Sequence, residues 1–218
     1  MIRHQFNSNL TLHSEDQYLG LPVQIDKGPL IGEYLDRLHQ TMSCALGQYS
    51  RVFAFRFDLR FPCDLNECNF NFDNQVIERF IESFKAKIRH NRQMAQRDNK
   101  YAHDTVVRYV WTREVPQQDR PHFHVAILLN CDAFFVLGSF EDGRDTMVNR
   151  LREAWASALG RTRDDVKGLV HIPDNACYHL HLDDGSSVAD FFYRSSYLCK
   201  SATKKYGNGC HGFGSSRI

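Results

Sequence analysis

The chain has 218 residues, of which 42% are hydrophobic and 24% are charged, and its formal net charge at pH 7 is +1. This length and composition indicate one soluble globular domain with at most a small elaboration. A chain so close to neutral has no general attraction for nucleic acid, so any nucleic-acid binding has to come from local basic patches.

The cysteine pattern and the polar N-terminal stretch point to a reducing compartment. The seven cysteines are an odd number and contain no C-x-x-C pair, and the start MIRHQFNSNLTLHSEDQ does not resemble a signal sequence. We therefore expect reduced thiols and a cytoplasmic protein. No run approaches the roughly 20 apolar residues of a membrane span, so no membrane association is expected.

The first third of the chain is expected to contain an irregular arm, a helix and a strand. Residues 1–28 show no sustained periodicity and predict the arm. Behind Pro29, apolar residues recur at helical spacing as far as Leu46, which predicts a helix. The stretch RVFAFRFDLRFP, residues 51–62, alternates phenylalanines and a leucine with small or charged residues, and therefore predicts a strand with one apolar face.

The middle of the chain predicts a long helix followed by two strands. The helix spans about 74–97, and strands follow over 104–115 and 120–130. The second half of the helix and the residues just after it are basic, which fits either a solvated face or a patch that contacts phosphate. The basic residues are Lys85, Lys87, Arg89, Arg92, Arg97 and Lys100.

The last third predicts a helix over 144–159 that ends at Gly160, short strands over 167–172 and 177–182, and a helix from Ser186 or Ser187 to about Lys204. Residues 206–218 are expected to form a glycine-rich tail. A β-α-β-β-α-β order predicts an α+β fold of the ferredoxin-like or RRM-like split type, with helices on one face of an antiparallel sheet. This single domain is expected to span residues 29–205, with the last helix on or beside the open face.

A candidate metal site begins with the histidines of PHFHV. Alternation along a strand places His122 and His124 on the same face, opposite the apolar Phe123. If a hairpin places Glu114 opposite His122, two imidazoles and a carboxylate converge, a ligand set that suits Mg²⁺ or Mn²⁺. This register is an assumption, because a slip of one residue turns Glu114 to the other face.

The last predicted helix carries a second candidate group. Tyr193, Tyr197, Lys200 and Lys204 recur at i, i+4, i+7 and i+11, so a continuous helix would align them on one stripe. The stripe fits an ordinary amphipathic surface, or a tyrosine nucleophile beside a lysine that contacts phosphate. A phenol with an ordinary pKa of about 10 needs a nearby cation and a polarised phosphorus atom in order to attack at neutral pH.

A second histidine pair, His179 and His181, has two readings. With His171 and Cys177 it could form a structural zinc cluster. Ligands at every second position of one strand do not readily close a tetrahedron, which favours ordinary core or edge-strand histidines instead.

Together, PHFHV and the later YLCK resemble the metal motif and the nucleophile helix of the HUH superfamily of single-strand endonucleases. Over residues 30–217 the blocks FRFDLRFP, WTRE, PHFHV and YLCK…TKKYG…FGSSR are similar to replication-initiator-like proteins of filamentous phages and cryptic prophages. The resemblance implies a divalent metal, Mg²⁺ or Mn²⁺, on His122 and His124 with a third ligand, which we assign to Glu114. It also implies that a tyrosine nicks and rejoins single-stranded origin DNA through a 5′-phosphotyrosine, which initiates rolling-circle-type replication.

Within this resemblance we expect Tyr197, with Lys200 three residues on, to make the first cut, and Tyr193 to be auxiliary or structural. The sequence has no G-x-x-x-x-G-K-[ST] motif, so we expect no nucleotide cofactor and a separate helicase of the host. The alternative is a DNA-binding or regulatory protein on the same fold, without catalysis. The residues expected at the DNA are Arg56, Asp58, Arg60, Lys204 and Lys205.

Overall fold

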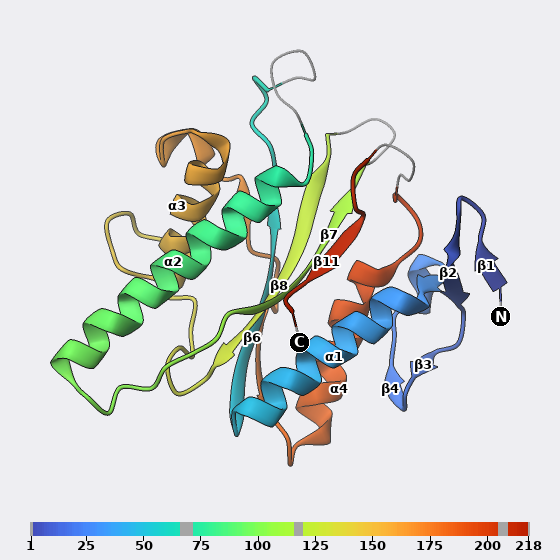
Figure 1. Ribbon diagram of the computed structural model, residues 1–218, viewed down its shortest axis with the longest axis horizontal. Helices are drawn as coiled ribbons and strands as arrows, with labels where there is room; N and C mark the ends of the chain where they lie inside the picture. The colour runs from blue at the N-terminus through green and yellow to red at the C-terminus, as the bar shows by residue number, and fades with distance from the viewer. Residues whose placement is uncertain (1, 66–71, 116–119, 205–208, 218) are drawn as a thin grey trace.

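The computed structural model describes residues 2–65, 72–115, 120–204 and 209–217. Within these ranges it has a mixed α+β fold with four α-helices and antiparallel sheets (Figure 1). The α-helices are α1 (Gly32–Gln48), α2 (Gln75–Asp98), α3 (Met147–Leu159) and α4 (Gly185–Ser196). The strands of the main sheet are β6 (Arg51–Leu59), β7 (Arg108–Glu114), β8 (His122–Asn130), β9 (Val170–His171), β10 (Cys177–His181) and β11 (Phe213–Ser215).

The main sheet has the strand order β10-β6-β8-β7-β11, and β9 pairs with the C-terminal end of β6. All of these pairings are antiparallel. Each strand of the predicted β-α-β-β-α-β series is present, although with shorter bounds than expected for β7 and β9. The sheet therefore places β8, which carries the two histidines of PHFHV, between β6 and β7.

One face of the sheet carries the larger core. Phe53, Phe55 and Phe57 of β6 are fully buried under α2 and α3, which lie together on this face (Figure 1). Trp155 of α3 joins them and donates from Nε1 to the Arg60 carbonyl oxygen at 2.8 Å. Burial of each such side chain contributes about 1.5–3 kcal/mol, so this row of aromatic residues contributes strongly to the stability of the domain.

The opposite face is covered over much of its length. The last helix was expected on or beside this face, but the face was otherwise expected to be open. α1 and α4 lie on this face (Figure 1) and bury Val52, Ala54, Ala126 and Leu128. The prediction of an open polar face was wrong because these positions are apolar and small enough for helices to pack closely. The candidate site lies on this face at the end of the sheet where Asp58 and Thr112 lie opposite His124 and Glu114 lies opposite His122.

The first 28 residues are more regular than the irregular arm that was expected. They form β1 (Ile2–His4), β2 (Asn7–His13), β3 (Gln17–Tyr18), β4 (Leu21–Pro22) and a 3₁₀ turn, Ile25–Lys27. β2 pairs with β5 (Leu30–Ile31), which leads directly into α1. β1, β3 and β4 have only two or three residues, which is too short for a two-residue alternation to be seen, and the seven residues of β2 contain just two apolar residues, Leu10 and Leu12.

The glycine-rich tail likewise contributes a strand, because β11 pairs with β7 and places Phe213 opposite Thr112. Gly214 lies against the Trp111 ring so closely that an added Cβ atom would come within 2.6 Å of it. A glycine is therefore needed for this strand to approach the sheet edge.

The last helix ends at Ser196, eight residues earlier than predicted. A 3₁₀ turn, Tyr197–Cys199, follows, and Lys200 adopts an extended backbone that bridges Leu30. The Ser201 amide donates to the Pro29 carbonyl oxygen at 2.9 Å. These tertiary hydrogen bonds replace the helical ones, and the expected continuous stripe of tyrosines and lysines does not form. No helix among the described residues is long and apolar enough to cross a membrane.

Candidate functional site

The pairing of β7 with β8 brings three candidate metal ligands together. Glu114 lies opposite His122, and Thr112 lies opposite His124, so the assumed register is confirmed. The two Nε2 atoms are 3.2 Å apart, and Glu114 Oε2 lies 3.5 Å from His124 Nε2 and 3.8 Å from His122 Nε2. Ligand atoms that share one ion at about 2.0–2.2 Å lie about 3–4 Å from each other, so the three residues fit one divalent metal.

Asp58 of β6 orients His124 from the side away from the other two ligands. Its Oδ1 atom lies 2.5 Å from His124 Nδ1, and its Oδ2 atom lies 3.2 Å from His171 Nδ1. A carboxylate at Nδ1 favours the tautomer whose proton is on Nδ1, which leaves the Nε2 lone pair facing Glu114. The contact of Asp58 with DNA stays a prediction; in the structure Asp58 bonds to His124, one of the three candidate metal ligands.

Glu114 is buried and surrounded by cationic groups. Burial alone would raise its pKa, but the interaction with His124 and the charges of Lys204 and Lys200 hold that pKa well below its usual value. The Lys204 side chain is 0% exposed with Nζ 3.6 Å from Glu114 Oε1, and burial lowers its pKa to about 8. The carboxylate is therefore ionised at neutral pH, as a metal ligand has to be.

The two histidines differ in their electrostatic surroundings. Burial and the neighbouring imidazole lower the pKa of His122, which favours its neutral, ligating form. Burial also disfavours the charged form of His124, but Asp58 and Glu114 outweigh it and raise the pKa of this histidine. Metal binding at this site is therefore expected to compete with a proton on His124.

Tyr197 lies beside this cluster. Its ring meets the His124 ring edge-on, with centroids 5.4 Å apart. Lys200 donates from Nζ to the Tyr197 phenol oxygen at 2.5 Å, and the same Nζ lies 3.1 Å from Glu114 Oε2. One lysine therefore links the phenol to the carboxylate. A protonated amine at this distance stabilises negative charge on the phenol oxygen.

The other candidate residues are distributed differently from the prediction. Tyr193 is 44% exposed on α4, and no contact joins it to the three ligands in the described part of the chain. Arg56 is buried with its guanidinium 5.7 Å from the centre of the Tyr197 ring. Lys204, expected at the DNA, is buried against Glu114. Lys205 lies outside the described residues.

Two hollows open on either side of Asp58 and His124, which line both. The smaller, with a volume of about 260 Å³, is also lined by Gln24, Lys27, Arg56, Pro173, Arg194 and Tyr197. The larger, with a volume of about 530 Å³, is also lined by Arg60, Phe61, Cys63, Arg120, Pro121, His122, Gly168 and Leu169. Arg60 thus lines a hollow beside the candidate site, and its contact with DNA stays a prediction.

Several residues of these hollows carried no recognisable signal in the sequence. Gln24 and Lys27 belong to the segment that was taken as an irregular arm. The position of Arg194, three residues before Tyr197, was the one sequence feature that could have indicated its place at the smaller hollow. The role of Asp58 was accessible in principle, because pairing of β6 with β8 places it directly opposite His124.

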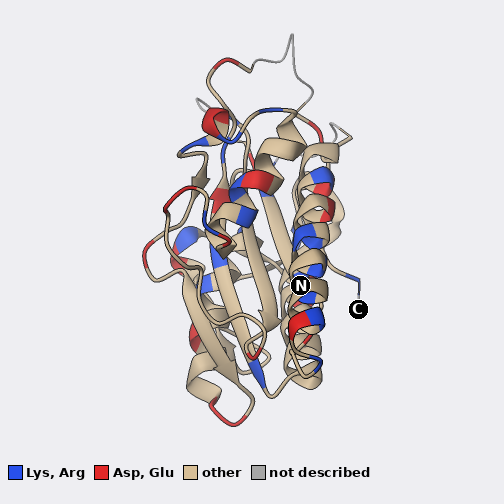
Figure 2. Cartoon of the chain, turned by 90° about the vertical axis from the view of Figure 1, so that its left-hand side faces the viewer, with Lys and Arg blue, Asp and Glu red and all other residues tan. Residues whose placement is uncertain are grey.

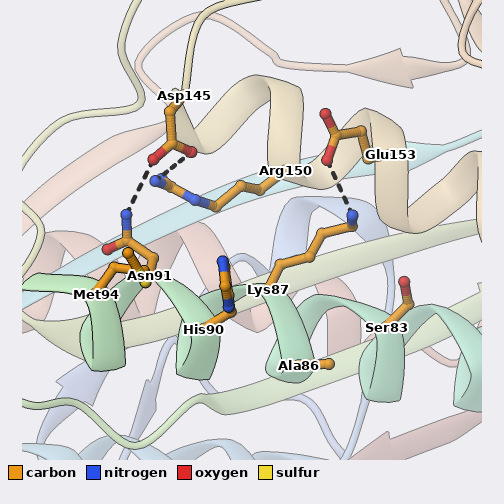
Figure 3. A pocket seen from close by; sticks show the side chains of 9 residues that line it. All are labelled: Ser83, Ala86, Lys87, His90, Asn91, Met94, Asp145, Arg150 and Glu153. Atoms are coloured by element: carbon orange, nitrogen blue, oxygen red, sulfur yellow. Dashed lines mark hydrogen bonds and ion pairs between the residues drawn. The ribbon is translucent and has the colours of Figure 1, made fainter.

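The basic half of α2 lies on the opposite face of the sheet. Lysines and arginines lie near acidic residues on this side of the molecule (Figure 2), although Asp98 is the acidic residue of the basic half of α2 itself. Lys87 of α2 pairs with Glu153 of α3 at 2.9 Å across the groove between the two helices (Figure 3). On the α3 side of the groove, Arg150 pairs with Asp145, which lies just before that helix, at 2.5 Å. Of the two interpretations left open, the pairing of Lys87 with Glu153 and of Lys85 with Glu82 favours a solvated face for these two lysines.

The second histidine pair does not form a metal cluster in the described part of the chain, where Glu114, His122 and His124 are the one group of three or more potential ligands. His179 bonds to the Phe135 carbonyl oxygen through Nε2, and His171 interacts with Asp58. This agrees with the reading of ordinary edge-strand histidines.

Comparison with known proteins places the chain in a family. The model of the YagK/YfjJ C-terminal domain matches residues 13–216. The chain belongs to this family. Escherichia coli K12 YagK is 32% identical over 199 residues, which cover 88% of this chain and 95% of YagK. YfjJ of the same strain is 30% identical over 200 residues, which cover 87% of this chain and 96% of YfjJ.

Both relatives are described as uncharacterized proteins, so their names suggest no activity for this YagK/YfjJ domain. No solved structure matches the chain. The function is therefore argued from the site itself.

Proposed function

We propose that this YagK/YfjJ domain is a metal-dependent endonuclease and ligase of the HUH type, acting on single-stranded DNA. The observation that carries the proposal is the contact of Lys200 with both the Tyr197 phenol and Glu114, which faces the two histidines. A nucleophile, a cation and a metal-ligand set thus meet within one site. Initiation of rolling-circle-type replication of a phage or prophage element is the role that the sequence resemblance adds.

Mg²⁺ or Mn²⁺ held by His122, His124 and Glu114 would supply Lewis-acid polarisation of the scissile phosphate. The chain's own residues prepare the ligands. Asp58 holds His124 in the ligating tautomer, and Lys200 and Lys204 keep Glu114 ionised. Because these side chains are already in place, little reorganisation is needed before the chemical step.

In the proposed cleavage the Tyr197 phenol oxygen forms a bond to phosphorus as the bond from phosphorus to the 3′ oxygen breaks. The phenol proton passes to solvent water as the bond forms, and the departing 3′ oxygen takes up a proton from water. Lys200 donates a hydrogen bond to the phenol oxygen and offsets the negative charge that develops there. Attack of a 3′-OH on the phosphotyrosine reverses these steps and joins strands.

We also propose that the core is the split β-α-β-β-α-β arrangement of ferredoxin-like folds. In support, the order β10-β6-β8-β7 is all antiparallel, and α2 and α3 pack on the same face. The absence of a P-loop motif from the sequence supports a separate helicase of the host as partner. The described cysteines are free thiols, which supports a cytoplasmic location.

The decisive experiment incubates the purified protein with single-stranded oligonucleotides that tile the element encoding it, with Mn²⁺ or with EDTA. We expect a covalent protein–DNA adduct that survives denaturing electrophoresis, forms only with metal, and is absent from Tyr197→Phe. Binding of the oligonucleotides without an adduct on any of them would contradict the proposal and favour a non-catalytic DNA-binding protein.

A further inference from the structure

The smaller hollow beside Tyr197 contains a buried cation that lacks a paired anion. Arg56 is 6% exposed, and its Nε atom is buried without a hydrogen-bond partner. Its guanidinium forms no ion pair with a carboxylate of the described residues; Asp58, the nearest acid that influences it, is engaged with two histidines. A buried guanidinium without an anion costs stability, so its presence points to a negatively charged ligand.

The guanidinium is fixed in position rather than mobile in the hollow. Its Nη1 atom donates to the Arg194 carbonyl oxygen at 2.8 Å, near the end of α4. One face of the group lies over the Tyr197 ring at 5.7 Å from the ring centre. A planar donor group held in this way matches the oxygens of a phosphate group better than a flexible ammonium does.

The rest of the hollow adds positive charge and a rigid wall. Arg194 and Lys27 both line it, and Lys27, half-exposed, is paired with Asp26 at 3.2 Å. The wall is tied to α4 through Gln24, whose amide donates to Ser196 Oγ at 2.9 Å and whose Nε2 atom donates to the Tyr193 carbonyl oxygen at 3.1 Å. The N-terminal segment is therefore part of the site.

We propose that this hollow is a phosphate subsite, in which Arg56 binds a phosphate group of the nucleic-acid strand next to the one that Tyr197 attacks. The inference rests on the proposed function for the identity of the strand. The volume of about 260 Å³ accommodates a phosphate group with its sugar. His124 and Tyr197 line the same hollow, so a phosphate held there fixes the position of the strand relative to the nucleophile.

The test measures binding without chemistry. Fluorescence anisotropy of a labelled 20-nucleotide oligothymidine is recorded in EDTA with the full chain, as wild type, Arg56→Met, Arg56→Lys and Arg194→Gln. Arg89→Gln is the matched control, because it removes an arginine charge from an exposed position on α2, on the opposite face of the sheet. Circular dichroism checks that each variant is folded.

We expect Arg56→Met to weaken binding about tenfold and to reduce the slope of log affinity against log salt by about 0.7. Arg56→Lys should recover part of the affinity, and Arg89→Gln should bind as wild type does. Competition by inorganic phosphate then shows which form of phosphate the subsite binds. If inorganic phosphate displaces the oligonucleotide from wild type but not from Arg56→Met, the subsite binds a free or terminal phosphate. If inorganic phosphate displaces the oligonucleotide from neither protein, the subsite requires a phosphodiester.

Wild-type affinity and salt slope in folded Arg56→Met would overturn the subsite. This outcome is distinct from failure of the proposed cleavage. Loss of affinity in Arg56→Met without any Mn²⁺-dependent adduct in wild type would overturn cleavage alone, whereas an adduct in wild type with unchanged binding by Arg56→Met would overturn the subsite alone.

Discussion

Lys200 donates from Nζ to the phenol oxygen of Tyr197 at 2.5 Å, although the two residues do not share the helix that sequence periodicity predicts. The helix ends before Tyr197, and the 3₁₀ turn with the extended Lys200 brings the ammonium back to the phenol. The same ammonium reaches Glu114. The end of α4 is thus shaped by its contacts with the site.

This contact predicts which tyrosine becomes attached to DNA. Tyr197→Phe should abolish the covalent adduct, because among the described tyrosines Tyr197 is the one whose phenol bonds to Lys200 and whose ring contacts His124. Tyr193→Phe, four residues earlier on α4, should retain it and serves as the matched control. Peptide mapping of the adduct of the wild-type protein checks the assignment, and DNA found on Tyr193 would contradict it.

The ligand cluster predicts a specific loss of metal affinity. His124→Ala removes one of three ligands and should weaken Mn²⁺ binding by more than the roughly 10–100-fold that loss of a ligand's orienting partner costs. Calorimetric titration of the folded variant measures the affinity. His179→Ala, a histidine on β10 outside the cluster, should bind Mn²⁺ as wild type does. Equal affinities for wild type and His124→Ala would remove the metal assignment.

The ligands could be predicted from the sequence because they depend on local alternation and on one hairpin register. A strand that buries Phe123 has to present His122 and His124 together, and the observed register brings Glu114 to them. The end of α4 could not be predicted, because the hydrogen bond from the Ser201 amide to the Pro29 carbonyl oxygen and the bridge between Lys200 and Leu30 replace helical hydrogen bonds there. Such contacts between distant segments leave no periodic trace in either segment.

The strand β11 in the C-terminal tail was not predicted, because it too depends on a contact with a distant segment, β7. Its close approach to β7 leads to a prediction about stability. Gly214→Ala should destabilise the protein by about 1–3 kcal/mol, because the new Cβ atom would overlap the Trp111 ring. Gly47→Ala on α1 has open space around it and should stabilise the helix by up to about 1 kcal/mol. Urea unfolding of both variants measures the two shifts, and a neutral Gly214→Ala would show that β11 does not depend on this close approach.

Substitution of Asp58 tests whether this residue orients a metal ligand, His124, without binding the metal itself. The residue does not face Glu114 or His122; it acts through the Nδ1 atom of His124. Asp58→Asn keeps the shape of the side chain but removes the charge, so the ring loses its strongest preference for the ligating tautomer. We expect Mn²⁺ affinity to fall by about 10–100-fold while the protein stays folded.

The matched control for Asp58→Asn is Asp183→Asn, which makes the same change at an exposed position beyond β10. Calorimetric titration with Mn²⁺ should give the wild-type affinity for the control. The loss should also be smaller than that of His124→Ala, because all three ligand atoms remain. An Asp58→Asn variant with wild-type affinity would mean that Asp58 does not orient His124, and an affinity as low as that of His124→Ala would make Asp58 a ligand itself.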